Sequence, residues 1–247
     1  KSHRFYRKFK VITNRKMCEF KKVTHCIFDM DGLLLDTEEV YEEIVRQIAG
    51  SFNKSYPHDV RVKMLGSTEL KSAQIAVSEL ELPISVEEYL SIFTKKCKEM
   101  LGHSPLMKGA ERLLRHLHAH NIPIALATSS GEHMVEIKIT NHGEVFSLFH
   151  HRVCGSTDPE VKEGKPSPDI FLIAASRFPD KPDPSKCLVF EDAPNGVTAA
   201  LSAGMQVVMV PDVRMSEELR KGATKVLKSL EDFRPEEFGL PPFPTTC

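Results

Sequence analysis

The stretch "CIFDMDGLLLDT", residues 26–37, ends an apolar run with two aspartates and a glycine. The apolar run, residues 23–28, predicts a buried strand. Because side chains alternate between the two faces of a strand, Asp29 and Asp31 point the same way. Two carboxylates so close repel each other unless a cation lies between them or one carries a proton. Gly32 allows a sharp turn and lets a ligand approach the backbone. The same pattern occurs in solvated turns and helix caps, so the rest of the chain has to decide between these interpretations.

The composition is that of an ordinary globular protein. The 247 residues are 41% hydrophobic and 27% charged, with a formal net charge of −1. A chain of this length forms one large domain or one domain with a sizeable insertion. The near-neutral charge gives no reason to expect a nucleic acid polymer or a membrane surface as partner, and no apolar run approaches the roughly 20 residues of a membrane-spanning helix. We therefore expect a soluble, cytoplasmic monomer that acts on a small molecule.

The six cysteines are scattered along the chain, without a CxxC pair. Cys26 and Cys187 lie within apolar, strand-like runs, and we interpret them as small core residues. The pattern suggests neither a disulfide framework nor a zinc site, which fits a reducing cytosol.

The N-terminal residues 1–22 differ in charge from the rest. They hold nine lysines or arginines and a single acid, Glu19. A basic, acid-poor segment is typical of a transit peptide, of a disordered extension, or of translated sequence upstream of a start at Met17. We interpret residues 1–22 as a basic, disordered extension.

Residues 38–104 contain helical patterns and no convincing strand. The segment "TEEVYEEIVRQIAGSF" places apolar residues at helical spacing behind Thr37, the expected N-cap. Two further helical segments, "STELKSAQIAVSELEL" and "SVEEYLSIFTKKCKEML", are separated by a Leu-Pro pair. We predict that residues 38–104 form an all-helical insertion.

From residue 105 onward, apolar strand-like runs alternate with helical segments. The runs are "IPIALATSS", "HHRVCG", "CLVFEDA" and "MQVVMVP", which together with residues 23–28 make five. Such alternation predicts a parallel sheet with helices on both faces, joined by right-handed crossovers. The predicted fold class is α/β. A Rossmann-like core of five parallel strands is formed by residues 23–37 and 105–247, and the helical cap of residues 38–104 is inserted into it.

Polar side chains collect where these strands end. In a doubly wound sheet, ligands bind at the carboxyl ends of the strands, and a lysine-bearing "GKPSPD" loop precedes the fourth strand. The candidate site residues are Asp29, Asp31, Thr128, Ser129, Lys165, Glu191 and Asp192. Hydroxyl groups, a lysine and four acids at one rim are a more specific signal than any one of them.

Each of these groups has a physical role in handling a phosphate ester. Carboxylates of Asp29 and Asp192, with a backbone oxygen near Asp31, suit Mg²⁺, which prefers hard oxygen ligands. Thr128 and the following residues can hold phosphate oxygens, and Lys165 offsets the crowding of negative charge. Asp29 can then attack phosphorus as nucleophile, giving an aspartyl-phosphate. Asp31 can donate a proton to the leaving oxygen and later accept one from water.

Four motifs, "DMDGLLLDT", "LATSS", "GKPSPDIF" and "FEDAPNG", resemble those of the haloacid dehalogenase superfamily, in the same order. The resemblance implies a nucleophile at Asp29, an acid/base at Asp31 and a phosphate contact at Thr128. It further implies a stabilising lysine at Lys165 and a metal ligand at Asp192. Glu191 matches the neighbouring acid, which usually supports the metal ligands without binding the metal itself.

The position of the helical insertion is similar to that in the beta-phosphoglucomutase-like subgroup, whose cap closes over the site. The implied activity is Mg²⁺-dependent hydrolysis of a small, nucleotide-like phosphate monoester. Tyr41 and Gly66 are the candidates for substrate selection by the cap.

Two alternatives to a phosphatase stay open. A sugar phosphomutase would use the same aspartates, although such mutases usually carry a histidine at the position that matches Tyr41. A non-catalytic receiver-type signalling domain also combines an aspartate with threonine, lysine and Mg²⁺. Receivers, however, carry further acids before the phosphorylated aspartate and have no cap.

Overall fold

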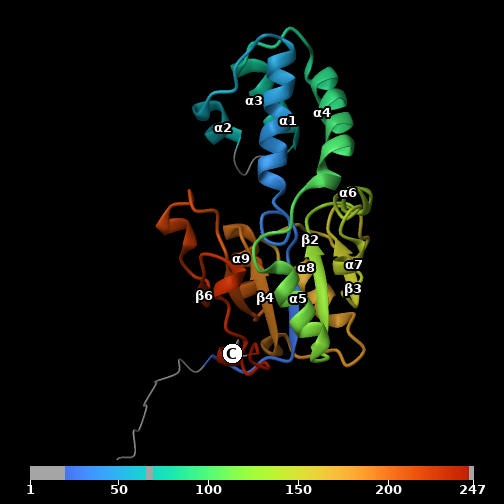
Figure 1. Cartoon of the computed structure of the whole chain (residues 1–247), viewed down its shortest axis with the longest axis vertical. Coiled ribbons are helices and arrows are strands. Elements are labelled where there is room, and N and C mark those ends of the chain that lie inside the picture. Colours follow the sequence, from blue (N-terminus) through green and yellow to red (C-terminus); the bar gives the residue numbers. More distant parts are fainter. Residues whose placement is uncertain (1–19, 65–68, 245–247) are drawn as a thin grey trace, which may run out of the picture.

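The computed structural model describes residues 20–64 and 69–244 (Figure 1). Gly66 and most of the basic N-terminal segment lie outside these residues. The described strands are β1 (His25–Phe28), β2 (Ile124–Thr128), β3 (His151–Cys154), β4 (Cys187–Glu191), β5 (Gln206–Met209) and β6 (Lys225–Val226). The described helices are α1 (Thr37–Ser51), α2 (His58–Met64), α3 (Glu69–Glu79), α4 (Val86–Met100), α5 (Ala110–Ala119), α6 (Glu132–Lys138), α7 (Gly143–Phe146), α8 (Asp169–Ser176) and α9 (Pro194–Ser202).

The strands form one parallel sheet in the order β3-β2-β1-β4-β5-β6. The five strands predicted from apolar runs are all present, but the predicted number of five is wrong, because the described sheet has six. The additional strand, β6, pairs two residues with the end of β5. A strand of two residues at a sheet edge is too short to show an alternating pattern, so its sequence gives no strand signal.

Helices cover both faces of the sheet, as predicted. Along β1, Cys26 and Phe28 pack with α5, α7 and the C-terminal segment, while Ile27 packs on the opposite face with α8 and α9. The alternation of side chains along a strand produces this division. Cys26 and Cys187 are fully buried without a disulfide, which confirms their interpretation as core residues.

Residues 20–22, which the sequence assigned to the basic extension, lie against the core. The ring of Phe20 stacks on Phe238 at a centroid distance of 4.6 Å. The backbone N–H of Lys21 donates to Gln206, whose side-chain amide donates back to the Lys21 carbonyl. The folded core therefore includes residues 20–22, which precede the apolar run that predicts β1.

Helices α1 to α4 pack together around their own apolar centre, beyond the carboxyl ends of the strands (Figure 1). Buried residues from each helix contribute, among them Ile48 of α1, Ala76 of α3 and Tyr89 of α4. Helix α4 begins with a capping box, in which Ser85 and Glu88 each bind the other's backbone N–H.

Helix α1 corrects one expectation. Thr37 is its first residue and not its N-cap, a position that Asp36 occupies without a capping hydrogen bond from its side chain. The Thr37 hydroxyl donates instead to the Asp31 carboxylate. A hydrogen bond to a charged carboxylate is stronger than one between neutral groups, and it holds the Thr37 hydroxyl beside Asp31.

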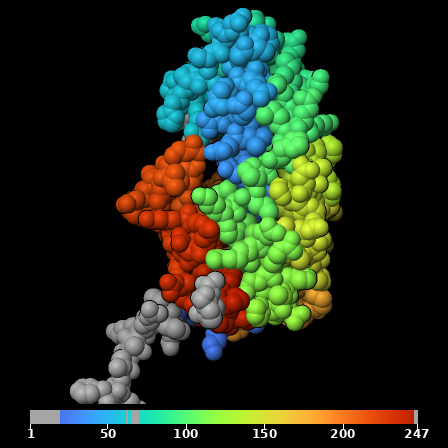
Figure 2. Space-filling model, in the orientation of Figure 1, coloured from blue at the N-terminus to red at the C-terminus, as the bar shows by residue number. Residues whose placement is uncertain are grey.

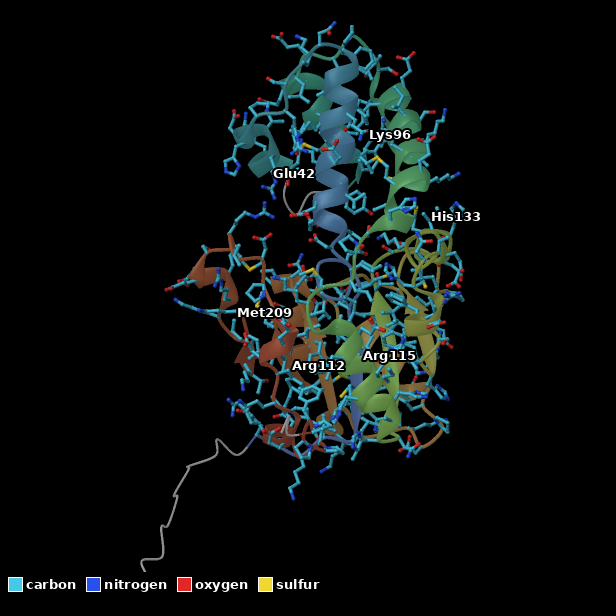
Figure 3. All side chains as sticks on the ribbon, viewed as in Figure 1. Glu42, Lys96, Arg112, Arg115, His133 and Met209 are labelled. Atoms are coloured by element: carbon cyan, nitrogen blue, oxygen red, sulfur yellow. The ribbon has the colours of Figure 1, made fainter. Side chains whose placement is uncertain are left out.

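Charged residues join the helical group to the sheet-containing part. Glu42 of α1, labelled in Figure 3, forms an ion pair with Arg61 of α2 at 3.1 Å and with Arg214 of the loop after β5 at 3.9 Å. Figure 2 shows the surface hollowed between α2 and this loop. Among the described residues, no helix combines the length and apolar character needed to cross a membrane.

Candidate active site

The sheet order brings the four sequence motifs together, because β1 lies between β2 and β4. The Lys165 ammonium group connects them. It donates to Oδ1 of Asp29 at 2.5 Å, to Oε1 of Glu191 at 2.6 Å and to the carbonyl of Ala127 at 3.1 Å. The Lys165 side chain is buried. All three of its N–H donors are used, so the ammonium group is held in one position between two carboxylates.

Glu191 is almost completely buried, and both of its carboxylate oxygens have partners. Oε1 accepts from Lys165, and Oε2 accepts from the backbone N–H groups of Asp192 and Ala193 at 3.0 and 3.1 Å. A Cβ on Gly196 would lie 1.8 Å from Oε1, so only glycine leaves room for this carboxylate. Glu191 thus holds Lys165 and the start of α9 in place, which suits the supporting role that we predicted for it.

Gly32 is required where β1 meets the loop after β4. Its φ of +79° lies in the left-handed region, and a Cβ there would lie 2.3 Å from Oδ2 of Asp192. Glycine adopts this conformation without steric cost. The turn that the sequence predicted after Asp29 and Asp31 therefore also lets Asp192 approach.

Asp29, Glu191 and Asp192 place oxygen atoms within 4.8 Å of one another. Burial and the charges of Glu191 and Asp31 raise the pKa of Asp29, Lys165 lowers it, and together they bring it to about 7. Burial and the charges of Asp29 and Glu191 likewise raise the pKa of Asp192 well above its ordinary value. We call Asp29, Lys165, Glu191 and Asp192 the Asp29 cluster.

The Asp29 cluster fits a hard divalent cation. Three carboxylates lie together beside one ammonium group, which binds two of them. Burial first and the neighbouring carboxylates second raise the pKa values of Asp29 and Asp192, and a bound cation would offset both effects. Carboxylate oxygens are the ligands that Mg²⁺ prefers. Asp29 and Asp192 would hold the ion, since both Glu191 oxygens already accept hydrogen bonds.

Asp31 lies in different surroundings. Its Oδ1 accepts from the Thr37 hydroxyl at 2.8 Å and from the Lys138 ammonium at 2.6 Å, and its Oδ2 accepts from the Ser130 hydroxyl at 3.0 Å. Burial by itself raises the pKa of Asp31, but the Lys138 charge and these hydrogen bonds outweigh it and hold the pKa below its ordinary value. We call Asp31, Thr37, Ser130 and Lys138 the Asp31 cluster.

The residues predicted to bind phosphate lie at the end of β2. Thr128 is buried, and its Oγ1 accepts from the Ser130 N–H at 3.1 Å. Ser129 is exposed at the rim, and its carbonyl accepts from the Ser156 hydroxyl at 2.6 Å. Their roles toward phosphate stay predictions.

Lys138 and Ser130 of the Asp31 cluster were not selected as site residues from the sequence. Lys138 ends α6 and is one of 33 lysines and arginines, so its sequence context carries no signal. Ser130 lies within the "LATSS" motif, and its position two residues after Thr128 was the available signal.

Of the two candidates for substrate selection, Tyr41 is described. It lies on α1, where its ring stacks with Phe93 of α4 at 6.0 Å and lies 5.6 Å from the Lys138 ammonium. Tyr41 therefore contacts both the helical group and the Asp31 cluster. Gly66 lies outside the described residues.

Comparison with known proteins gives concordant results. A family model described as a haloacid dehalogenase-like hydrolase matches residues 23–204. A protein of Drosophila melanogaster named "Probable pseudouridine-5'-phosphatase" is 56% identical over 90% of this chain and 96% of its own length. "(DL)-glycerol-3-phosphatase 2" of Arabidopsis thaliana is 49% identical over 90% of this chain and 93% of its own length. A crystal structure from Thermotoga maritima, provisionally assigned as a beta-phosphoglucomutase, superposes with a TM-score of 0.74 at 30% identity, covering 85% of this chain and 96% of that one.

Proposed function

The chain belongs to the haloacid dehalogenase-like hydrolase family, and from this premise we propose that it is a Mg²⁺-dependent phosphatase whose substrate is pseudouridine 5'-phosphate. The observation that carries the phosphatase assignment is the Asp29 cluster. In this cluster Asp29 provides a nucleophile, the buried Lys165 between Asp29 and Glu191 provides a positive partner, and Asp29 with Asp192 provides a place for a metal ion.

The proposed reaction has two steps, both carried by aspartates. An oxygen of Asp29 forms a bond to phosphorus while the bond to the ester oxygen breaks. The leaving oxygen takes its proton from the fraction of Asp31 that is protonated at Oδ2, and Asp31 is then an ionised carboxylate. Water then attacks the aspartyl-phosphate, Asp31 accepts a proton from it, and the bond between Asp29 and phosphorus breaks. Bound Mg²⁺ would neutralise part of the negative charge that the phosphate, Asp29 and Asp192 bring together.

Lys165, Thr128 and Ser129 have supporting roles in this proposal. The fixed Lys165 ammonium offsets the negative charge that gathers when a phosphate approaches Asp29, and the end of β2 holds phosphate oxygens. Uncatalysed hydrolysis of phosphate monoesters is so slow that the site must lower the barrier by on the order of 20 kcal/mol or more. A covalent intermediate formed among fixed charges is a way to reach that figure.

The substrate assignment depends on the helical group, which we infer to be a cap formed by residues 38–104. The Drosophila relative named for pseudouridine-5'-phosphatase is more similar to this chain than the Arabidopsis relative named for glycerol-3-phosphatase, at 56% against 49% identity. A ribose and a base need hydrogen-bond partners and an apolar wall, for which Tyr41 and the segment around Gly66 are our candidates. Burying a polar base edge without partners costs about 1–3 kcal/mol, so a matched site discriminates against other esters.

The test is a substrate panel with and without Mg²⁺. We expect a higher kcat/KM for pseudouridine 5'-phosphate than for uridine 5'-phosphate, ribose 5-phosphate, glycerol 3-phosphate, glucose phosphates or phosphoglycolate. Glycerol 3-phosphate is the second candidate because of the 49% identical relative. A better rate with it would refute the substrate and leave the phosphatase intact; product release as an isomerised sugar phosphate would favour a phosphomutase instead.

We further propose that the enzyme works as a monomer in the cytoplasm on free small molecules. The near-neutral charge and the absence of a disulfide among the cysteines that the structure describes support this proposal. Size-exclusion chromatography with light scattering and imaging of a tagged full-length chain test the two points separately.

A further inference from the structure

Lys138 is a buried ammonium group for which the proposed two-step reaction has no use. Its side chain is 1% exposed, although lysines are seldom buried unless they are paired. It lies on α6, which no sequence motif includes, and its partner Asp31 lies 107 positions away in the chain. A charge placed so far inside the protein needs a partner that compensates its desolvation.

The contacts of Lys138 are directed at one carboxylate. The ammonium donates to Oδ1 of Asp31 at 2.6 Å and to the Ser130 hydroxyl at 2.8 Å, and Ser130 in turn donates to Oδ2 of Asp31. The ring of Tyr41 lies 5.6 Å from the ammonium. Lys138 therefore contacts both oxygens of Asp31, one directly and one through Ser130.

This arrangement fixes the orientation of the carboxylate. With Thr37, Oδ1 accepts two hydrogen bonds from side chains, and within the described residues Oδ2 accepts one. A carboxylate oxygen offers about two lone-pair sites, so Oδ2 keeps one for a transferred proton. A proton donor or acceptor is effective only when it is held within hydrogen-bond reach of its partner.

We propose that Lys138 is a positioning residue that holds the Asp31 carboxylate in the orientation from which Oδ2 exchanges the proton of the leaving group. The proposal rests on the proposed phosphatase function, since it assigns a task within that reaction. Lys138 itself touches neither substrate nor phosphorus and forms no bond during the reaction. Through Tyr41, the same ammonium ties the position of α1 to that of Asp31.

The test compares two esters that differ in their need for a proton. Pseudouridine 5'-phosphate releases an alkoxide that must be protonated, whereas 4-nitrophenyl phosphate releases an anion that is stable without a proton. Glycerol 3-phosphate replaces the first ester if the panel identifies it as the substrate. The readouts are kcat and KM for the alkyl ester and the rate of the first-turnover burst of 4-nitrophenol.

In Lys138→Met we expect kcat for the alkyl ester to fall about 10- to 100-fold, within the range that general acid–base catalysis contributes. KM and the burst rate should stay within about threefold of the wild type, because neither depends on proton delivery by Asp31. Lys138→Arg retains the charge and should recover most of the loss. Lys186→Met makes the same replacement at an exposed lysine in the turn just before β4, at the opposite end of that strand from the site, and should match the wild type.

A double-mutant cycle shows whether Lys138 acts through Asp31. Once Asp31→Asn has removed the carboxylate, Lys138→Met should lower kcat for the alkyl ester by less than about threefold further. If the two substitutions lowered kcat independently, so that the double variant showed the product of the two single losses, the proposal would be overturned. Equal losses with both esters, a change in KM alone, or no change in Lys138→Met would overturn it as well.

Two safeguards separate the possible failures. If Lys138→Met does not fold, Ser130→Ala removes the connection to Oδ2 and should give the same pattern to a smaller extent; an unchanged ratio of the two esters in that variant would refute the proposal. A wild-type enzyme that hydrolyses neither ester refutes the proposed function itself, which is a different result from a normal enzyme insensitive to Lys138.

Discussion

The Asp29 cluster and the Asp31 cluster begin two residues apart on the same strand end, and each pairs an aspartate with a buried lysine. Their pKa shifts nevertheless have opposite directions: that of Asp29 rises to about 7, and that of Asp31 falls. Burial acts on both in the same sense. The local balance of charge differs, because three carboxylates lie beside Lys165 whereas Asp31 has Lys138 to itself.

The comparison teaches that burial alone does not decide what an aspartate can do. An excess of negative charge prepares the Asp29 cluster for a cation, and the charge of that cation together with Lys165 then lets a phosphate approach. A neutral pair with three hydrogen bonds keeps Asp31 in place whether or not a ligand is bound. The two clusters therefore serve charge neutralisation and proton transfer, respectively, in the proposed reaction.

The largest expected effect is that of Asp29→Asn on turnover. An amide is a very poor nucleophile toward phosphorus, so we expect kcat to fall by about 10⁴-fold or more, together with weaker Mg²⁺ binding. Folding should survive, because the group lies at the rim of the sheet. Steady-state kinetics and a circular dichroism spectrum check both points, and substantial turnover in a folded variant would contradict the covalent mechanism.

The corresponding change in the other cluster, Asp31→Asn, should be milder and depend on the leaving group. We expect kcat for an alkyl phosphate to fall about 10²- to 10⁴-fold. The first-turnover burst from an aryl phosphate should be largely retained, because that leaving group needs no proton. If the first-turnover rate fell by the same factor for alkyl and aryl esters, Asp31 would not be the proton donor and the proposed separate roles of the two clusters would be wrong.

Gly32→Ala tests the contact that completes the Asp29 cluster. The added Cβ would lie 2.3 Å from Oδ2 of Asp192 at a φ of +79°, so Asp192 or the turn must shift. Displacing a metal-binding carboxylate in this way should raise the Mg²⁺ concentration for half-maximal activity by about 10- to 100-fold. Saturating Mg²⁺ should recover part of the activity; a variant with unchanged Mg²⁺ dependence would mean that Asp192 does not bind the ion.

The smallest effects concern stability, and they have opposite signs in the two clusters. In metal-free protein, the raised pKa of Asp29 costs the folded state stability as pH rises from about 4 to about 7. Asp29→Asn removes this cost, so its melting temperature relative to the wild type should increase by roughly 10 °C over that range. Above pH 7 the difference should stay constant.

Asp31→Asn should behave in the opposite way. The lowered pKa of Asp31 stabilises the folded state at all pH values above about 4, and that contribution is lost as pH falls through the folded-state pKa. The variant should therefore melt below the wild type at neutral pH, and the gap should narrow in acid. Melting curves from pH 3 to 8 with a chelator present measure both variants. If the melting-temperature difference from the wild type changed with pH in the same direction for both, the two clusters would not differ as proposed.

Much of the core could be predicted because its signals are local. Five of the six described strands are continuous apolar runs, and three of the site residues, Asp29, Thr128 and Glu191, stand at or directly after strand ends. The sixth strand, β6, is too short to show periodicity. Thr37, the expected N-cap, donates instead to the nearby carboxylate of Asp31. In the first case there was no local pattern to read, and in the second a neighbour in space overrode it.

The sequence by itself determined the order of the motifs, the alternation of strands with helices and the rim at which the acids meet, because side-chain periodicity and strand ends are properties of short segments. Only the tertiary structure decided that Lys165 joins Asp29 to Glu191, that Lys138 reaches Asp31 across 107 positions, and that Glu42 meets Arg214. The physical reason is that a pKa depends on the charges and dielectric around a group in space. Those surroundings come from segments that are distant in the chain and become neighbours only when the sheet and its helices pack.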